Sequence, residues 1–116
     1  MHELSIALSI VSSVEGIAVE RGYARIEAVT VQIGELSGVD KAALTFAWEL
    51  AAAGSRAAGS RLEFRDVELE VKCPSCGVQR HPPKTWQLAC PTCPAVAPEI
   101  VTGRELHIVA LEVPTE

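Results

Sequence analysis

Two closely spaced cysteine pairs constrain this chain more than any other feature. Cys73 and Cys76 are the first and last residues of the motif CPSC, and Cys90 and Cys93 are those of CPTC. Thirteen residues separate the two pairs. Each CxxC turn can direct two thiolates toward a shared point, where a tetrahedral Zn²⁺ binds at about 2.3 Å from each sulfur. Because no secretory signal precedes them, the cysteines favour metal binding over disulfides. The pattern predicts a zinc site with four cysteine ligands.

The predicted zinc site is structural. Four thiolates fill a tetrahedral coordination sphere and leave no position for a substrate. An insert of about thirty residues cannot bury a sufficient core, so the metal must supply much of its folding free energy. A four-cysteine iron centre suits the same geometry. A dithiol redox pair is a weaker alternative, because neither CxxC is predicted to open a helix.

Length and charge restrict the classes of fold and partner. A chain of 116 residues is expected to form one domain, or one domain with a small annex. Its net charge of -5 disfavours nucleic acid and anionic membranes as partners. The N-terminus has no positive region, and no apolar run approaches the roughly 18 to 20 residues that span a bilayer. We therefore expect a cytoplasmic protein.

Periodicity predicts two helices and a strand in the first half. Residues 4–19 place apolar side chains on one broad arc, which predicts a buried helix face ending near Gly22. Residues 24–35 alternate as a half-buried strand. Asp40 is the predicted N-cap of a second helix. Its expected apolar side comprises Leu44, Phe46, Ala47, Leu50 and Ala51.

The second half is predicted to contain two strands separated by an insert. Residues 61–72 form the first strand, whose apolar phase changes near Asp66 and predicts a bulge or hinge there. Residues 73–103 lack periodicity, and RELHIVALEV at residues 104–113 predicts a returning strand. The expected fold class is α+β: two helices packed on a small mixed sheet, with an inserted domain resembling a zinc ribbon.

The N-terminus offers a second set of metal ligands. The bulk of His2 favours retention of Met1, whose amine, with the His2 backbone nitrogen, the His2 imidazole and the Glu3 backbone nitrogen, forms a chelate of four nitrogens. Such a plane suits Ni²⁺ or Cu²⁺. The Glu3 side chain either hydrogen-bonds near the metal or favours the positive end of the first helix. The simpler alternative is a frayed terminus without metal.

The cysteine-rich segment also leaves a binding role open. No Asp or Glu occurs from Lys72 through Ala97, and this locally basic stretch is compatible with a zinc ribbon that binds nucleic acid. A basic surface around a dianionic zinc centre is the simpler interpretation, because Trp86 is the one aromatic residue there and stacking platforms usually need several. His81 and His107 are predicted to lie outside the set of metal ligands.

Four motifs in order give the chain a family resemblance. MHEL at the N-terminus, GELSGV at residues 34–39, the paired CPxC turns and GREL at residues 103–106 closely resemble the HypA/HybF family of hydrogenase maturation nickel metallochaperones. The resemblance implies a nickel-binding α/β domain of residues 1–70 and 104–116 and an inserted zinc-binding domain of residues 71–103. It also implies Ni(II) as cargo at Met1, His2 and Glu3, and structural Zn(II) on the four cysteines.

The resemblance further implies partners rather than a reaction. Members of the HypA/HybF family insert nickel into the large subunit of [NiFe]-hydrogenase together with the GTPase HypB, and some serve urease. We expect that the protein is not an enzyme, because its sequence lacks paired carboxylates at catalytic spacing, a GxSxG motif, a phosphate-binding loop and an HExxH motif. The alternative is a zinc-ribbon module that binds nucleic acid or protein without a nickel role, and a small metalloenzyme ranks last.

One position departs from the family pattern. Glycine usually follows the second CPxC, whereas this chain has Pro94, which lacks an N–H that could donate toward a cysteine sulfur. We predict that the second turn binds zinc without that donor. A metal-loaded protein in which only Cys73 and Cys76 are ligands would contradict this.

Overall fold

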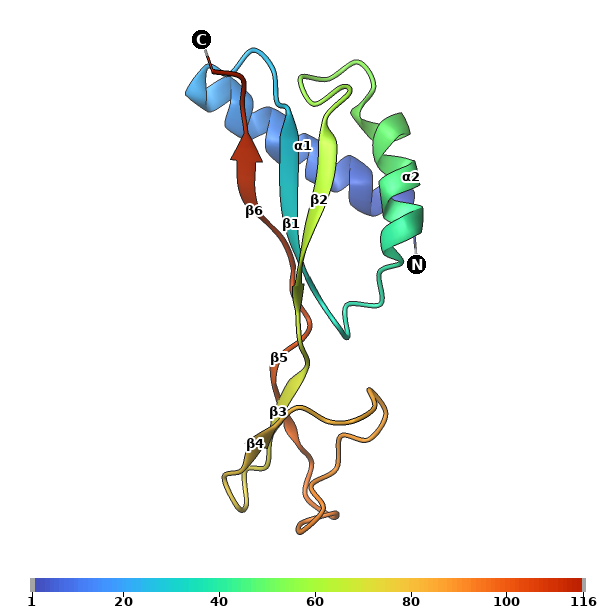
Figure 1. Cartoon of the computed structure of the whole chain (residues 1–116), viewed down its shortest axis with the longest axis vertical. Helices are drawn as coiled ribbons and strands as arrows, with labels where there is room; N and C mark the ends of the chain where they lie inside the picture. The colour runs from blue at the N-terminus through green and yellow to red at the C-terminus, as the bar shows by residue number, and fades with distance from the viewer. Residues whose placement is uncertain (1, 116) are drawn as a thin grey trace. The chain divides into compact units, whose positions relative to one another are not determined.

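The computed structural model describes residues 2–115, which form two helices and six strands (Figure 1). The strands belong to two three-stranded sheets, with the orders β2-β1-β6 and β4-β3-β5. The predicted α+β class is confirmed. The elements are α1 (Glu3–Arg21), β1 (Ala28–Gly34), α2 (Lys41–Ala52), β2 (Arg61–Val67), β3 (Glu70–Lys72), β4 (Gln79–Arg80), β5 (Glu99–Thr102) and β6 (Leu106–Glu112).

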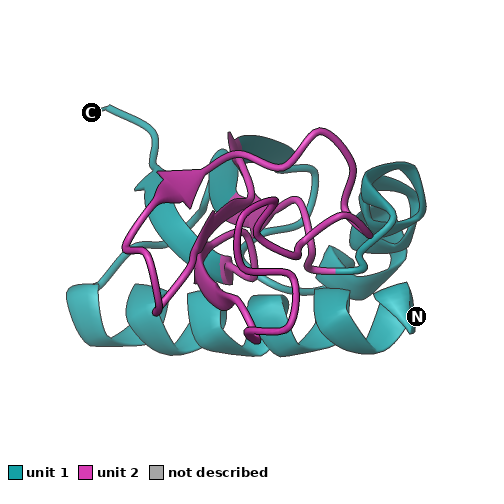
Figure 2. Cartoon of the chain, turned by 90° about the horizontal axis from the view of Figure 1, so that it is seen from below, with its two compact units in different colours: residues 1–31, 38–65, 107–116 teal, residues 32–37, 66–106 magenta. Residues whose placement is uncertain are grey.

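The chain divides into two compact units, coloured separately in Figure 2. The first comprises residues 1–31, 38–65 and 107–116, and contains both helices. The second comprises residues 32–37 and 66–106, and contains all four cysteines. The predicted insert, residues 71–103, lies within the second unit, which also takes in the end of β1 and the loop after it.

Helix α1 buries a narrower face than its sequence predicts. Gly22 ends the helix in the left-handed conformation, with φ of 73°, as expected. Leu4 and Leu8, which the apolar arc places in the core, are 48% and 50% exposed. A helix packed on one side needs only a stripe of apolar residues, so the rest of a wide arc reaches the surface. Its buried residues are Ala7, Ile10, Val11, Val14 and Ala18.

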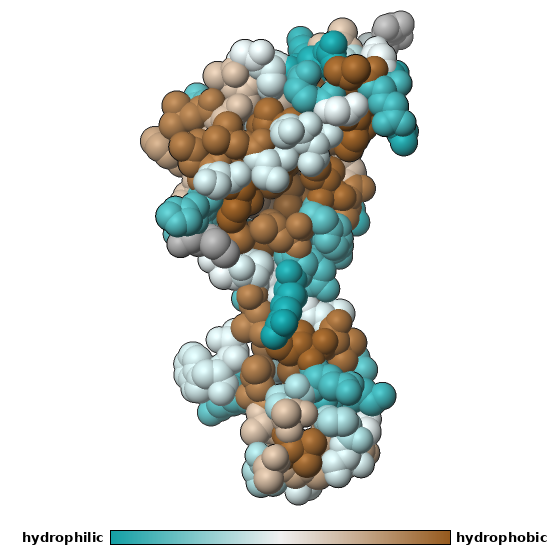
Figure 3. All heavy atoms as spheres, turned by 180° about the vertical axis from the view of Figure 1, so that it is seen from behind, coloured by the Kyte–Doolittle hydropathy of each residue, from teal (hydrophilic) through white to brown (hydrophobic). Residues whose placement is uncertain are grey.

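Helix α2 begins at its predicted cap, but part of its expected core face is wrong. The Asp40 carboxylate accepts the backbone N–H of Ala43 at 3.1 Å. Phe46 and Leu50 are 73% and 65% exposed. At 100° per residue they lie roughly 200° and 240° around the helix from Leu44, on its opposite side. Apolar side chains therefore reach the surface of the unit that carries the helices (Figure 3).

The buried face of α2 is completed by a tryptophan. Trp48 is 3% exposed, and its indole N–H donates to the Ser60 hydroxyl at 3.0 Å. This bond satisfies the polar end of a side chain whose rings fill the core. The residues that α2 buries are Leu44, Ala47, Trp48, Ala51 and Ala52.

The sheet of β2, β1 and β6 is mixed, as predicted. Arg61 donates its backbone N–H to the Glu27 carbonyl, and Glu35 donates to the Val67 carbonyl. Both strands therefore advance in the same direction, so β1 and β2 are parallel, whereas β6 runs opposite to β1 (Figure 1). The core face of β1 is apolar, with Val29, Val31 and Ile33 at 0%, 0% and 3% exposure.

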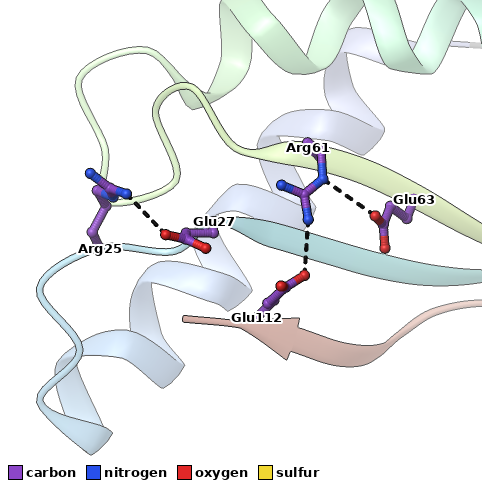
Figure 4. Close-up of polar contacts among 5 residues, drawn as sticks. All are labelled: Arg25, Glu27, Arg61, Glu63 and Glu112. Atoms are coloured by element: carbon purple, nitrogen blue, oxygen red, sulfur yellow. Dashed lines mark hydrogen bonds and ion pairs between the residues drawn. The ribbon is translucent and has the colours of Figure 1, made fainter. Parts of the chain in front are cut away.

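Exposed ion pairs lie at the end of the sheet where β1 and β2 begin and β6 ends, and one of them joins two strands (Figure 4). Arg61 of β2 lies 2.9 Å from Glu112 of β6 and 3.4 Å from Glu63, and Arg25 lies 3.1 Å from Glu27. These side chains are between 33% and 65% exposed. Exposed pairs of this kind are each worth at most about 1 kcal/mol, so the apolar layer beneath them determines the fold.

The predicted strand of residues 61–72 is two strands in the structure. Strand β2 ends at Val67 and β3 begins at Glu70, and the pairing of β3 with β5 is irregular between Glu70 and Val71. The irregularity therefore follows Asp66, which is itself part of β2. The change of apolar phase seen in the sequence reflects a break between sheets.

Three segments of the second unit cross closely beside this break. Leu36 donates its N–H to the Gly103 carbonyl at 2.6 Å, and the Glu35 carboxylate accepts the Leu69 N–H at 2.8 Å. A Cβ added at Gly34 would collide with the Gly103 carbonyl. The GELSGV and GREL motifs therefore meet here, where glycine permits backbone contact.

Candidate metal centres

The four cysteines of the second unit lie together. Their sulfur atoms are all within 4.8 Å of one another, and those of Cys76 and Cys90 are 3.7 Å apart. A tetrahedral ion with bonds of about 2.3 Å requires sulfurs about 3.8 Å apart. Cys73 and Cys90 are buried, whereas Cys76 is exposed and Cys93 is intermediate. The donor set and spacing fit a metal bound by four thiolates.

The first CPxC turn is held by a β-hairpin. Strands β3 and β4 pair antiparallel and flank the turn. Cys73 accepts the Gly77 N–H at 2.8 Å and donates its own N–H to the Val78 carbonyl at 3.0 Å. Gly77 adopts a φ of 77°, a left-handed conformation that suits glycine. The hairpin thus fixes both Cys73 and Cys76 at one end of a sheet.

The second CPxC turn is held by local hydrogen bonds outside any strand. Cys93 donates its N–H to the Cys90 carbonyl at 3.3 Å, and Val96 donates to the Cys93 carbonyl at 3.1 Å. The Thr92 hydroxyl oxygen lies 3.2 Å from the Cys90 sulfur. Pro94 follows with no N–H of its own.

Thr92 favours the thiolate form of Cys90. Hydrogen bonds from the Thr92 side chain and backbone, with smaller contributions from Cys93 and Cys76, lower the pKa of the Cys90 thiol to about 6 despite its burial. Thiolates are the metal-binding form of cysteine. Thr92 is therefore a supporting residue that cysteine spacing alone does not reveal, although a hydroxyl inside a CPxC turn is its visible sign.

The N-terminal candidates lie in the first unit. Met1 falls outside the described residues. His2 precedes α1 as an exposed N-cap residue without a side-chain capping bond, and its carbonyl accepts the Ile6 N–H at 3.1 Å. The imidazole therefore stands at the very start of the helix, within reach of solvent.

Glu3 connects the beginnings of the two helices. Its Oε2 accepts the backbone N–H of Asp40 at 3.2 Å, while the Asp40 carboxylate caps α2. Asp40 is predicted from the sequence only as a cap, because 37 positions separate it from Glu3. The first turn of α1 is thus attached to α2 directly beside His2.

Comparison with known proteins identifies the family. The family described as "Hydrogenase/urease nickel incorporation, metallochaperone, hypA" matches residues 1–113. The chain belongs to the HypA family. The resemblance inferred from the four motifs is confirmed, and the family is one of nickel metallochaperones for hydrogenase maturation rather than of enzymes.

Relatives and solved structures match this HypA family member over nearly all of its length. The hydrogenase maturation factor HypA of Roseiflexus sp. (strain RS-1) is 44% identical over 112 residues, covering 97% of this chain and 91% of that protein. That of Chloroflexus aurantiacus (strain ATCC 29366 / DSM 635 / J-10-fl) is 43% identical, covering 98% and 100%. The solution structure of the Ni metallochaperone HypA from Helicobacter pylori matches with a TM-score of 0.72 and 29% identity, over 100% of both chains.

His81 lies outside the cysteine cluster of this HypA family member and has a different role. Its Nδ1 lies 2.7 Å from the Leu69 carbonyl and 3.9 Å from the Glu35 carboxylate. The bond to Leu69 raises the pKa of His81, and the nearby carboxylates of Glu35, Glu68 and Glu70 raise it further. His81 therefore joins the segment after β4 to Leu69 and, when protonated, to Glu35 of the GELSGV motif. His107 belongs to β6.

Neither helix of the described chain meets the length and hydropathy required to cross a bilayer. This agrees with the short apolar runs in the sequence.

Proposed function

We propose that this HypA family member carries Ni(II) at its N-terminus and delivers it for maturation of [NiFe]-hydrogenase. The observation that supports the proposal best is the bond between Glu3 and the Asp40 N–H. It anchors the first turn of α1, so that the exposed His2 is presented beside an ordered helix start.

The proposed nickel ligands are nitrogen atoms of the first three residues. They are the Met1 amine, the backbone nitrogen and imidazole of His2, and the Glu3 backbone nitrogen, a set that suits planar Ni²⁺. The Glu3 carboxylate accepts the backbone N–H of Asp40. We therefore propose that the Glu3 side chain orients the chelate. Ligation requires neutral His2 and deprotonated amides, so binding should release protons and weaken as pH falls.

The proposed resident metal is Zn(II), bound by Cys73, Cys76, Cys90 and Cys93. Four thiolates suit zinc as well as iron, and their full coordination gives the ion a structural role. We further propose that residues 71–103 act as the zinc-binding domain and residues 1–70 and 104–116 as the nickel-binding domain.

Delivery is proposed to involve two protein partners in the cytoplasm. Nickel bound mainly through the start of a chain can be passed on more readily than an ion enclosed by a fold. The proposed recipient is the hydrogenase large subunit, with the GTPase HypB as co-chaperone, and urease maturation is a second proposed destination.

Nickel titration tests the N-terminal site. We expect untagged protein to bind Ni²⁺, and both a short N-terminal extension and His2→Ala to abolish this binding while zinc content stays unchanged. His107→Ala is the matched control, because it removes one imidazole from β6 and should leave nickel binding intact. Nickel binding that survives both the extension and His2→Ala would show the proposed site to be wrong.

The second candidate is a zinc-ribbon module without a nickel role. It is favoured by the absence of carboxylates from Lys72 through Pro98 and by the exposed Trp86 in that stretch. Wild-type protein that binds no nickel but retards DNA, with an affinity that falls steeply as salt rises, would support this alternative.

A further inference from the structure

Trp86 is unusually exposed for its residue type. Its exposed fraction is 75%, whereas that of Trp48, the other tryptophan, is 3%. Tryptophan is costly to leave in water because it presents a large apolar surface. It is also among the residues most enriched at the energetic centres of protein interfaces. The position of Trp86 therefore calls for a partner.

We call residues 84–89 the Trp86 turn, and hydrogen bonds hold its conformation. Arg80 of β4 lies with Nη2 at 3.2, 3.0 and 2.6 Å from the carbonyl oxygens of Gln87, Leu88 and Ala89. Gln87 also donates its N–H to the Lys84 carbonyl at 3.0 Å. By hydrogen-bonding to three successive carbonyl groups, the Arg80 guanidinium fixes the backbone that follows Trp86. The turn is thus pre-organised, which lowers the entropy lost on binding.

The charge around the Trp86 turn differs from that of the whole chain. Lys84 Nζ lies 5.9 Å from the centroid of the Trp86 ring. All fifteen carboxylate residues of the chain lie outside residues 72–98, although the net charge is -5. Because Arg80 is engaged with carbonyls, Lys84 is the cation presented beside the ring. An apolar ring with an adjacent ammonium complements an apolar pocket bordered by carboxylates.

We propose that the Trp86 turn docks the nickel-receiving hydrogenase subunit, with the ring in an apolar pocket and Lys84 against carboxylates at its rim. The inference rests on the proposed function and adds to it the surface for the recipient. A protein fits better than single-stranded nucleic acid, because the turn offers one aromatic ring and the chain carries net negative charge.

Binding of purified, nickel-free hydrogenase large subunit to the zinc-loaded full chain tests the inference. Trp86→Ala should weaken binding at least about thirtyfold, as expected for a central interface tryptophan. Lys84→Met should weaken it less and reduce its salt dependence. Arg80→Ala should weaken it as well, because it leaves the ring in place but removes the support of the turn.

Phe46→Ala is the matched control, since it removes an aromatic ring that is 73% exposed on α2. This variant should bind the subunit as wild type does. Equal binding by Trp86→Ala, or no binding by wild type, would overturn the inference. Binding of a labelled DNA or RNA 20-mer that is lost in Trp86→Ala would instead assign the turn to nucleic acid.

Nickel titration of the same proteins separates this inference from the proposed function. Trp86→Ala should bind nickel normally, and His2→Ala should bind the subunit normally. Unchanged subunit binding by Trp86→Ala together with normal nickel binding refutes the docking surface alone. If wild-type protein binds no nickel but its binding of the subunit still depends on Trp86, only the nickel site is refuted.

Discussion

At the scale of single residues, Gly34 is required because backbone occupies the space of its missing side chain. A Cβ there would overlap the carbonyl of Gly103 and approach Arg104 N at 2.7 Å. We predict that Gly34→Ala lowers the free energy of unfolding by about 3 kcal/mol, since neither backbone can move without breaking the crossing. Urea unfolding of the metal-loaded protein measures the change.

Gly16 provides the control for Gly34. It lies within α1, and apart from its chain neighbours and the helix's own backbone no heavy atom stands within 4 Å of the position of an added Cβ. Gly16→Ala should therefore stabilise the protein by about 0.5 to 1 kcal/mol, through the higher helix propensity of alanine. Equal losses in both variants would mean that the crossing does not impose the requirement at Gly34.

His81 makes the second unit sensitive to pH. Its bond to the Leu69 carbonyl raises the pKa above the ordinary 6.5, so protonated His81 stabilises the folded state. This contribution is complete below pH 6.5 and is lost as pH rises through the folded pKa. NMR titration of the His81 ring should show the raised pKa, and Glu35→Gln should reduce the elevation. A His81 pKa at or below 6.5 would contradict the assignment.

At the scale of elements, the Asp40 cap stabilises α2. Asp40→Ala removes the acceptor for the Ala43 N–H and should cost about 1 kcal/mol of unfolding free energy. Asp40→Ser keeps a capping oxygen and should lose much less. Both variants retain the backbone N–H that Glu3 accepts. Thermal unfolding followed by circular dichroism measures the two effects, and equal losses would contradict a capping role.

The sequence predicts elements well where one local signal decides them. Gly22 and Asp40 mark helix ends through backbone geometry that depends on adjacent residues. Burial is harder to predict, because Phe46 and Leu50 are apolar yet face away from the core. The apolar composition of α2 shows that the helix can be buried. Only its packing in the structure shows which side of the helix faces the core.

The candidate sites differ in the same way. Cysteine spacing predicts the cluster, since a CxxC turn brings its own two ligands together. The contact of Glu3 with Asp40 joins helices 37 positions apart, and no local pattern encodes it. Thr92 is an intermediate case, because its hydroxyl within the CPTC turn is visible in the sequence, whereas its position beside the Cys90 sulfur is visible only in the structure.

At the scale of the whole molecule, the two units should depend on metal to different degrees. The second unit contains the short strands β3, β4 and β5 and the end of β1, and it buries few side chains: Ile33, Leu69, Val71 and Pro82, with Cys73 and Cys90. Its cysteine-rich loops therefore lack a sufficient apolar core, and metal must supply their folding free energy. The first unit contains both helices and most of the buried apolar residues.

We predict that removing the metal of the cysteine cluster, proposed to be zinc, with a chelator unfolds the second unit and leaves α1 and α2 folded. Amide hydrogen exchange should show protection lost over residues 66–106 and retained in the helices, and Cys73→Ser should reproduce this pattern. The end of β1, residues 32–34, belongs to the second unit, so its protection should fall while that of residues 28–31 persists. Uniform loss across both helices would mean that the chain folds as one cooperative unit, and no loss would mean that the cysteine cluster needs no metal to fold.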